Sequence, residues 1–380
     1  MKKFRIAFCI VCMNRLHHLK KTLLQNIKDN EDYLDLEFII INYNSRDGMD
    51  EWIKENFEQY ISSGKIVYYR TPDPETFSHS HSKNLAFTLA SGDILCNINA
   101  DHFTGPGFAK YVNGQFNKYD RMVLTTVDYF KVKTDYNPSK DVFGKVCVRK
   151  EDFLRVRGFD ERMDHYGFED WDFVNRLELD GCRRVFIEDF SYLNFIPHGE
   201  EERYTLKKDG EDLKGIYINY LSSSLSGLLF LYTNNTYHKG TVVDNYAIRS
   251  NDYRSAYLPP EKRFEFNLVE EFWTKGVWQK NGDDLFVLSN GTGHEIIMQF
   301  CQGIKELREL ESGNMFYLLE DSDTQNSLLS FNYFYNNRSI MERNLEQKQV
   351  MVNTNNRYGQ AMVYKNYGLN NTSHHNEKLQ

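Results

Sequence analysis

The sequence has little of what marks a membrane-spanning, secreted or nucleic-acid-binding protein. Its longest mainly apolar stretches, such as 6–13 and 225–232, are far shorter than the roughly 20 residues that cross a bilayer. The chain opens without the pattern of a signal peptide. Lys and Arg number 46 against 54 Asp and Glu, so the net charge of −8 argues against a general nucleic-acid binder. We therefore expect a cytoplasmic protein that does not bind nucleic acid.

Cysteine is also scarce, with six scattered residues. Cys9 and Cys12 form a C-x-x-C pair, but they lie in a strand-like apolar run, and no second pair completes a zinc site. The sequence therefore predicts buried free thiols in a reducing compartment.

The first hundred residues alternate between two hydrophobic periods. Short apolar runs predict strands, and apolar residues spaced three and four apart predict helices between them. The expected strands are 4–12, 36–41, 65–69 and 93–98, and the expected helices are 16–27, 49–60 and 80–90. This alternation predicts an α/β fold with a mainly parallel sheet flanked by helices. Such sheets bind ligands at the carboxyl ends of their strands, which points to the loops after Cys12, Ile41 and Ile98.

A chain of 380 residues is long enough for two domains. Beyond about residue 204 alternating strands and turn signals predict a smaller β-rich region, although 295–310 reads as a helix and 314–319 as a strand. We expect a first domain at 1–204, an accessory domain at 205–352, and a polar tail at 353–380 whose last ten residues are disordered. Aromatic residues of the accessory domain could line a binding groove, but a core explains them as well and is favoured: Phe264, Phe266, Trp273 and Trp278.

The first candidate site is Asn99-Ala100-Asp101-His102, directly after the fourth strand. A carboxylate there can hold a divalent cation against a diphosphate and so assist the departure of a nucleotide. The alternative is a turn or a helix cap, since Asn and Asp favour both.

The second candidate site is the acidic and aromatic run Phe168-Glu169-Asp170-Trp171-Asp172. The apolar face that follows predicts a helix beginning near Glu169, and carboxylates at that position can simply cap it. Three acids and two large aromatic residues exceed what a cap requires. We interpret one acid as a general base for an attacking hydroxyl and the aromatic rings as platforms for sugar faces.

The third candidate is His198, which follows the apolar run 192–196 in a Pro/Gly turn. A lone histidine is more often structural or exposed than a ligand. Imidazole combined with carboxylate and phosphate oxygens nevertheless suits Mn²⁺ as well as Zn²⁺.

Taken in order, these motifs resemble those of GT-A fold glycosyltransferases of the family 2 type, with a galactosyltransferase-like second half. The resemblance covers about residues 4–200. Residues 8–23 resemble the family's first strand and helix, and 38–48 its second strand and loop. Residues 82–95 match the stretch before the metal motif. The D-x-D position falls on 99–101, and the G-W-G-x-E-D-x-D segment on 167–172.

The resemblance implies a GT-A nucleotide-sugar-binding fold and residue roles. Asp170 corresponds to the base, and Asp101 with His198 corresponds to the site for Mn²⁺ or Mg²⁺. We also count Glu169 as catalytic, since with Trp171 it would orient the acceptor or donor sugar. The positions implied in binding the nucleotide-sugar are Met13, Asn14, Arg15, Asn42, Asn44, Lys83, Asn99 and Trp171. The reaction implied is transfer of a hexose or N-acetylhexosamine from a UDP-sugar to a glycan or lipid-linked acceptor. One candidate base without an evident nucleophile predicts inversion. The implied setting is polysaccharide biosynthesis, and peripheral association with the inner face of the cell membrane stays open.

Two positions depart from the family pattern. Asn42 stands where an acid usually contacts the uracil or ribose, which leaves the nucleobase open. Asn99 replaces the first acid of the D-x-D and removes one negative charge beside the metal.

Two other functions compete with this interpretation. A sugar-phosphate nucleotidyltransferase would usually have a Gly-rich, Arg-containing loop after the first strand, where this chain has Cys12-Met13-Asn14-Arg15. A non-catalytic carbohydrate-binding protein on the same fold is favoured by Asn42 and Asn99.

Overall fold

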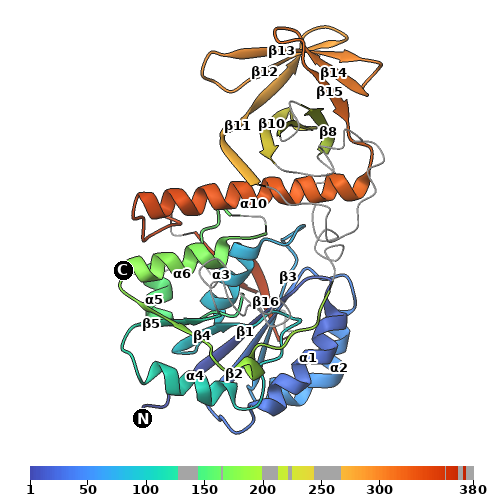
Figure 1. Ribbon diagram of the computed structural model, residues 1–380. Coiled ribbons are helices and arrows are strands. Elements are labelled where there is room, and N and C mark those ends of the chain that lie inside the picture. Colours follow the sequence, from blue (N-terminus) through green and yellow to red (C-terminus); the bar gives the residue numbers. More distant parts are fainter. Residues whose placement is uncertain are drawn as a thin grey trace. The chain divides into compact units, whose positions relative to one another are not determined.

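A computed structural model of the chain forms two compact units (Figure 1). It describes residues 1–126, 144–163, 166–198, 213–220, 225–243, 267–355, 357–366 and 371–373. The first unit comprises Met1–Leu206 together with Asn336–Gln380, and the second comprises Lys207–Tyr335.

The first unit is built on a nine-stranded sheet with the order β17-β16-β3-β2-β1-β4-β6-β5-β7. Strands β3, β2, β1 and β4 run parallel to one another, whereas β6 is antiparallel to both of its neighbours, so the sheet is mixed. The strands are β1 (Ile6–Cys12), β2 (Leu36–Tyr43), β3 (Ile66–Thr71), β4 (Ile94–Asn97), β5 (Met122–Thr125), β6 (Cys147–Arg149), β7 (Arg183–Phe186), β16 (Met362–Lys365) and β17 (Asn371–Ser373).

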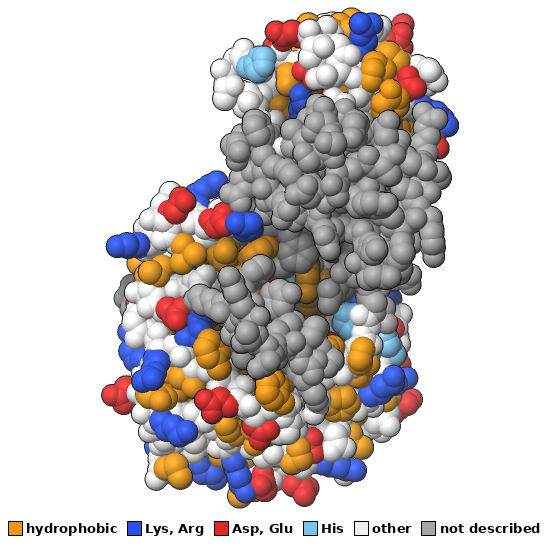
Figure 2. All heavy atoms as spheres, viewed as in Figure 1, with side chains coloured by type: hydrophobic (Ala, Val, Ile, Leu, Met, Phe, Trp, Pro, Cys, Tyr) orange, Lys and Arg blue, Asp and Glu red, His pale blue; other side chains and the backbone are white. Residues whose placement is uncertain are grey.

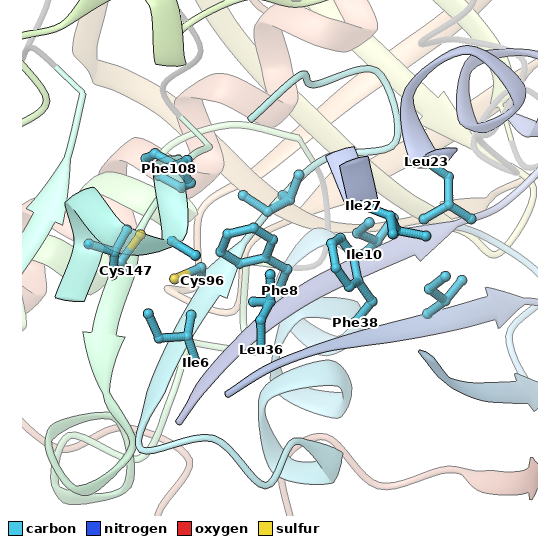
Figure 3. Packing of buried hydrophobic residues seen from close by; sticks show 14 of the residues in the cluster. Ile6, Phe8, Ile10, Leu23, Ile27, Leu36, Phe38, Cys96, Phe108 and Cys147 are labelled. Carbon is cyan, nitrogen blue, oxygen red and sulfur yellow. The ribbon is translucent and has the colours of Figure 1, made fainter. Parts of the chain in front are cut away.

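Helices cover both faces of this sheet, because successive side chains of the central strands point to opposite sides. Ile6, Phe8 and Ile10 of β1 belong to the core on one face (Figure 3), where three helices pack. Ala7 and Cys9 pack with three helices on the other face. The first group is α1 (Leu16–Asp29), α2 (Met49–Ser62) and α4 (Phe108–Phe116), and the second is α3 (His79–Leu89), α5 (Lys150–Arg155) and α6 (Glu169–Leu179). The α/β architecture and the predicted order of strands and helices are confirmed. All six cysteines are free, and only Cys301 is not fully buried.

The chain returns to the first unit after the second one. Strand β16 pairs antiparallel with β3, through Tyr364 with Arg70 and Lys365 with Tyr69. Helix α10 (Ser322–Glu346) belongs to the second unit up to Tyr335 and to the first unit from Asn336. This division differs from the sequence-based boundaries at 204 and 352, because residues 336–366 pack onto the sheet and helices of the first unit.

The second unit is a closed barrel with the strand order β10-β11-β12-β13-β14-β15-β8-β9. Its strands are β8 (Leu213–Tyr220), β9 (Leu225–Tyr232), β10 (Thr236–Val243), β11 (Asn267–Lys280), β12 (Leu285–Ser289), β13 (Glu295–Cys301), β14 (Glu306–Glu309) and β15 (Met315–Leu318). The expected β-rich region is thus confirmed. The helix predicted at 295–310 is wrong, because β13 and β14 occupy that stretch and pair with each other across a turn at Gly303. Residues there favour helices individually, but pairing within the barrel overrides their propensity.

Trp278 belongs to the barrel core, where its indole donates to the Tyr232 carbonyl over 3.0 Å. Phe264 and Phe266 lie outside the described residues, as does the side chain of Trp273. On the visible surface, acidic and basic side chains are intermixed (Figure 2). Among the described helices, none has both the length and the apolar character that crossing a membrane requires.

Candidate active site

The loops that follow β1 and β2 are tied to each other. Asn14 adopts a left-handed backbone conformation (φ 54°), which Asn tolerates better than most residues. Its backbone N–H donates to the Ser45 hydroxyl over 2.6 Å, and its side-chain oxygen accepts from the Arg46 N–H over 2.8 Å. Asp47 accepts from the N–H of Leu16 at the start of α1. Met13, which is buried, Asn14 and Arg15 therefore lie in one fixed rim at the carboxyl ends of these strands.

Asn42 and Asn44 lie at the end of β2 and in its loop, as predicted. The buried Asn42 amide donates to Asp50 over 2.7 Å and accepts from the Ser45 N–H over 2.7 Å. Asn44 (φ 56°) donates to the Pro74 carbonyl over 2.7 Å. Both side chains shape the loop, and the Asn42 amide uses both of its polar atoms inside the protein.

Asp101 and His198 meet although 97 positions separate them in the chain (198 − 101). A short antiparallel bridge joins His102 to Phe195, and the Ile196 N–H donates to the Asp101 carbonyl over 2.9 Å. Asp101 Oδ2 consequently lies 3.5 Å from His198 Nε2. The structure thus brings together the two side chains that the resemblance implies in metal binding.

The Asp101 carboxyl is held in its ionised form. Burial raises its pKa, but the neighbouring His102 and the hydrogen bond from His198 outweigh burial and hold the pKa well below its usual range. Burial also lowers the pKa of His102 to about 4, so that ring is neutral at pH 7.

An ionised carboxylate beside an imidazole is a donor pair that suits Mn²⁺. Within the described ranges, no three or more His, Cys, Asp or Glu side chains are grouped closely enough to hold a metal ion. The pair can therefore supply two ligands, with the remaining positions left to substrate oxygens and water.

Lys145 fastens the two segments that carry this pair, and the sequence analysis did not find it. Its fully buried ammonium donates to the Phe103 carbonyl over 2.9 Å and to the Tyr192 carbonyl. Burial lowers the pKa of Lys145 to about 7. A lysine flanked by apolar residues carries no pattern that separates it from a surface lysine, so only its contacts reveal this role.

The acidic run opens helix α6 as predicted. Phe168, at the N-cap, has a left-handed backbone (φ 65°), and Gly167 before it also has positive φ. The Gly167 N–H donates to Glu169 Oε2 over 3.0 Å, which braces this turn. The following residues, Glu169 and Asp170, are buried in the first turn of the helix, where its dipole favours negative charge.

Lys83 joins both acids from helix α3. Its ammonium donates to Glu169 Oε1 over 2.9 Å and to Asp170 Oδ1 over 2.6 Å. Burial lowers the pKa of Lys83, but the two carboxylates outweigh burial and raise it, so the ammonium stays charged. The structure thus places Lys83, which the resemblance implies in nucleotide binding, against the acids of α6.

The same cluster separates the pKa values of the two acids. Burial raises the pKa of Asp170 to about 6; Lys83 lowers it, and the charge of Glu169 raises it. Burial also acts to raise the pKa of Glu169, but Lys83 and His79 outweigh it, so the net change is downward. The pair therefore contains one acid that stays ionised and one that titrates near neutral pH.

Asp170 also approaches the D-x-D position. A Cβ atom built on Gly144 would lie 3.0 Å from Asn99 Nδ2 and 3.5 Å from Asp170 Oδ2. Asn99 and Asp170 consequently flank one backbone position, and Asn99 Oδ1 accepts from the Asn97 amide over 3.0 Å. The end of β4 and the start of α6 thus contribute to one site.

Two pairs of rings lie near Glu169, in sequence or in space. Trp171 is half-buried and packs edge-on against Phe168, with ring centroids 5.3 Å apart. His79, which the sequence analysis missed, has Nδ1 3.7 Å from Glu169 Oε1 and packs edge-on against Tyr166. Its position four residues before Lys83, one turn of α3, is a signal that could have indicated a shared helix face.

Comparison with known families assigns this region. Residues 7–185 match the model of Glycosyl transferase family 2. The matched segment makes up just under half of the chain. Its fold is the GT-A fold, with a mixed sheet flanked by helices, and the barrel is an additional β-rich region. The matched segment contains every predicted site residue except His198, which follows it. The galactosyltransferase-like character of the second half stays a prediction.

Solved structures with similarity to this chain are distant. The mannosyltransferase PcManGT from Pyrobaculum calidifontis, solved with GDP-Man and Mn²⁺, is 17% identical, with a TM-score of 0.41 over 50% of this chain and 56% of that one. S. aureus TarS 1–349, solved with UDP-GlcNAc, is 13% identical, with a TM-score of 0.44 over 55% of this chain and 63% of that one. The chain therefore spans less than two thirds of either structure. A search of curated proteins gives no match.

Proposed function

We propose that the protein is a metal-assisted, inverting glycosyltransferase. It transfers a hexose or N-acetylhexosamine from a UDP-sugar to a hydroxyl group of a glycan or lipid-linked acceptor. The observation that carries this proposal is the buried Asp170 carboxyl, raised in pKa to about 6 and lying beside Asn99 at the metal motif. A carboxyl in this range is mostly ionised at pH 7 and can still accept a proton efficiently.

Asp170 acts as the general base. The acceptor oxygen forms a bond to the anomeric carbon while the bond from that carbon to the diphosphate oxygen breaks. The acceptor proton passes to the Asp170 carboxylate, and the nucleoside diphosphate leaves with the bonding electrons. Attack by the acceptor itself inverts the anomeric configuration, which NMR analysis of the product would establish.

The leaving group requires charge neutralisation. Asp101 and His198 would hold Mn²⁺ or Mg²⁺, which supplies Lewis-acid stabilisation of the departing diphosphate. Asn99, a neutral amide, lies at the same strand end and leaves Asp101 as the principal carboxylate.

The surrounding residues bind the two substrates. The rim formed by Met13, Asn14 and Arg15 holds the nucleotide together with the loop of Asn42 and Asn44. Glu169, which stays ionised, accepts a sugar hydroxyl, and Trp171 offers an apolar ring to a sugar face. Lys83 holds Glu169 and Asp170 in place, so its contribution to nucleotide binding is indirect.

The decisive variant is Asp170→Asn. We expect its turnover to fall by about two to four orders of magnitude, the range that general-base catalysis contributes, with donor binding largely intact. Turnover is measured as UDP release from a panel of UDP-sugars with and without Mn²⁺, and binding by calorimetry with UDP.

Asp152→Asn is the matched control. Asp152 is also a buried acid in a helical first turn and is paired with Arg121 and Arg155, but it belongs to α5. Equal turnover in Asp170→Asn and the wild type would remove Asp170 from this role. Binding of UDP by a wild-type protein that releases no product would favour the non-catalytic carbohydrate-binding alternative.

A further inference from the structure

Two asparagines of helix α10 contact the polypeptide on either side of the proposed base. Asn337 donates from its amide nitrogen to the Gly167 carbonyl over 2.8 Å. Asn344 donates to Asp172 Oδ1 over 2.7 Å. Both asparagines are buried, each with 1% of its surface exposed. Glu169 and Asp170 lie between these two attachment points.

The two contacts come from one face of one helix. Asn337 and Asn344 are seven residues apart, which is close to two turns of an α-helix. Two turns rise about 10 Å, so the helix spans the first turn of α6 and the residues before it. A single rigid element therefore holds both sides of the segment that carries Glu169 and Asp170.

The Gly167 contact supports a turn that is unfavourable by itself. Gly167 has φ 102° and Phe168 has φ 65°, so two successive residues lie in the left-handed region. For a residue with a side chain, such as Phe168, this conformation is sterically unfavourable. The turn sets the direction in which the Glu169 and Asp170 side chains leave the backbone. The hydrogen bond from Asn337 is one of the interactions that stabilise this turn.

The Asn344 contact belongs to a buried polar network. Its amide nitrogen also donates to Asp160 Oδ2 over 3.0 Å, and its oxygen accepts from Arg162 Nη2 over 2.9 Å. Arg176 donates to the other oxygen of Asp172 over 2.7 Å. Both carboxylate oxygens of Asp172 thus accept from buried side chains, which restrains the first turn of α6.

We propose that Asn337 and Asn344 are positioning residues for the transfer reaction, acting through Gly167 and Asp172 on the orientation of Asp170. The segment after the barrel is then part of the catalytic apparatus, although the family model ends at residue 185. This inference rests on the proposed function only for its kinetic consequence. Its structural consequence, order in residues 166–172, is measurable without any substrate.

The chain offers a matched control in the same helix. Asn332 is also fully buried in α10, but its amide donates to the Tyr232 hydroxyl over 3.2 Å and is 2.8 Å from His238 Nδ1, both in the barrel unit. Asn332→Ala therefore removes a buried asparagine from α10 without removing a contact to α6.

The experiment compares Asn337→Ala, Asn337→Ser and Asn332→Ala in the full-length protein. Hydrogen exchange of the amides of residues 166–172 is expected to accelerate at least tenfold in Asn337→Ala and to stay within twofold of the wild type in Asn332→Ala. Asn337→Ser, which keeps a donor on a smaller side chain, covers the case in which Asn337→Ala does not fold. The exchange rate of Asn337→Ser should lie between the rates of the wild type and Asn337→Ala. If Asn337→Ala does not fold, the rate of Asn337→Ser should exceed that of the wild type.

The kinetic arm uses transfer with saturating donor. We expect kcat to fall at least tenfold in Asn337→Ala, with KM for the donor changed less than twofold, and Asn332→Ala to keep wild-type kcat. Equal effects of Asn337→Ala and Asn332→Ala on exchange, or unchanged exchange in both Asn337 variants, would overturn the inference. If Asn337→Ala exchanges faster but the wild-type protein shows no transferase activity, that result would count against the proposed function alone.

Discussion

Lys83 offers the sharpest test of how the site works, because two roles for it lead to different kinetics. Its ammonium lies 2.6 Å from Asp170 Oδ1 and 2.9 Å from Glu169 Oε1. If it tunes the acids, Lys83→Met changes the pH dependence of turnover. If it binds the nucleotide, as the resemblance implies, the same variant raises KM for the donor and leaves the pH dependence unchanged.

The size of the effect follows from the contacts. A hydrogen bond involving a charged group contributes about 1.5–3 kcal/mol, and about 1.4 kcal/mol corresponds to one pH unit in a pKa. Lys83 lowers the pKa of Asp170, which burial and Glu169 raise to about 6. Without Lys83 the carboxyl is protonated over a wider range, since two adjacent buried acids do not both ionise easily. The base is active only when ionised. The acidic limb of the pH dependence of turnover should therefore move from about pH 6 upward by about one to two pH units.

The assay is kcat between pH 5 and pH 9 at saturating donor and acceptor. Lys83→Met should lose about threefold to twenty-fivefold of its turnover at pH 6.5 and recover most of it by pH 8.5, given the shift above. Lys83→Arg keeps the positive charge and should retain the wild-type limb. An unchanged limb in Lys83→Met, together with a higher KM for the donor, would refute this reasoning and return Lys83 to the nucleotide site.

Two further predictions concern the metal pair and its support. His198→Ala removes one of the two proposed ligands, so the Mn²⁺ concentration for half-maximal turnover should rise at least about tenfold, the scale on which ligand support affects metal sites. An unchanged Mn²⁺ titration would exclude His198 as a ligand. Lys145 has a pKa of about 7 in the folded protein, below its ordinary value, so above pH 7 the unfolded chain binds a proton that the folded one has released. The free energy of unfolding should therefore rise from pH 7 to pH 9 relative to Lys145→Met, by up to roughly 1.4 kcal/mol per pH unit in urea titrations; parallel pH dependence in both proteins would contradict the assignment.

The local spacing of apolar residues was sufficient to predict the first strands and helices of the first unit. The apolar periods of 4–12, 16–27 and 36–41 predicted β1, α1 and β2, because each element buries a face that its own residues define. The start of α6 at Glu169 followed from the apolar face after it. Since parallel strands place their carboxyl ends at one edge, the strand-end loops could be predicted as the site before any contact was known.

Local pattern failed where pairing partners lie far apart. The segment 295–310 contains good helix formers, and only its neighbours in the barrel make it β13 and β14. The return of 336–366 to the first unit was likewise invisible, because nothing in a polar, Asn-rich segment specifies which sheet edge it will join.

The candidate site shows the same difference between what local sequence predicts and what long-range contacts decide. The sequence by itself indicated the candidate residues from residue type and order: Asp101, His198, Glu169 and Asp170. Their roles stay predictions. Their environments came from the tertiary structure. Only the packing of α3 against α6 brings Lys83 to Asp170, and only buried carbonyls give Lys145 its place. A pKa and a hydrogen-bond partner depend on burial and on atoms distant in sequence, and folding alone brings these together.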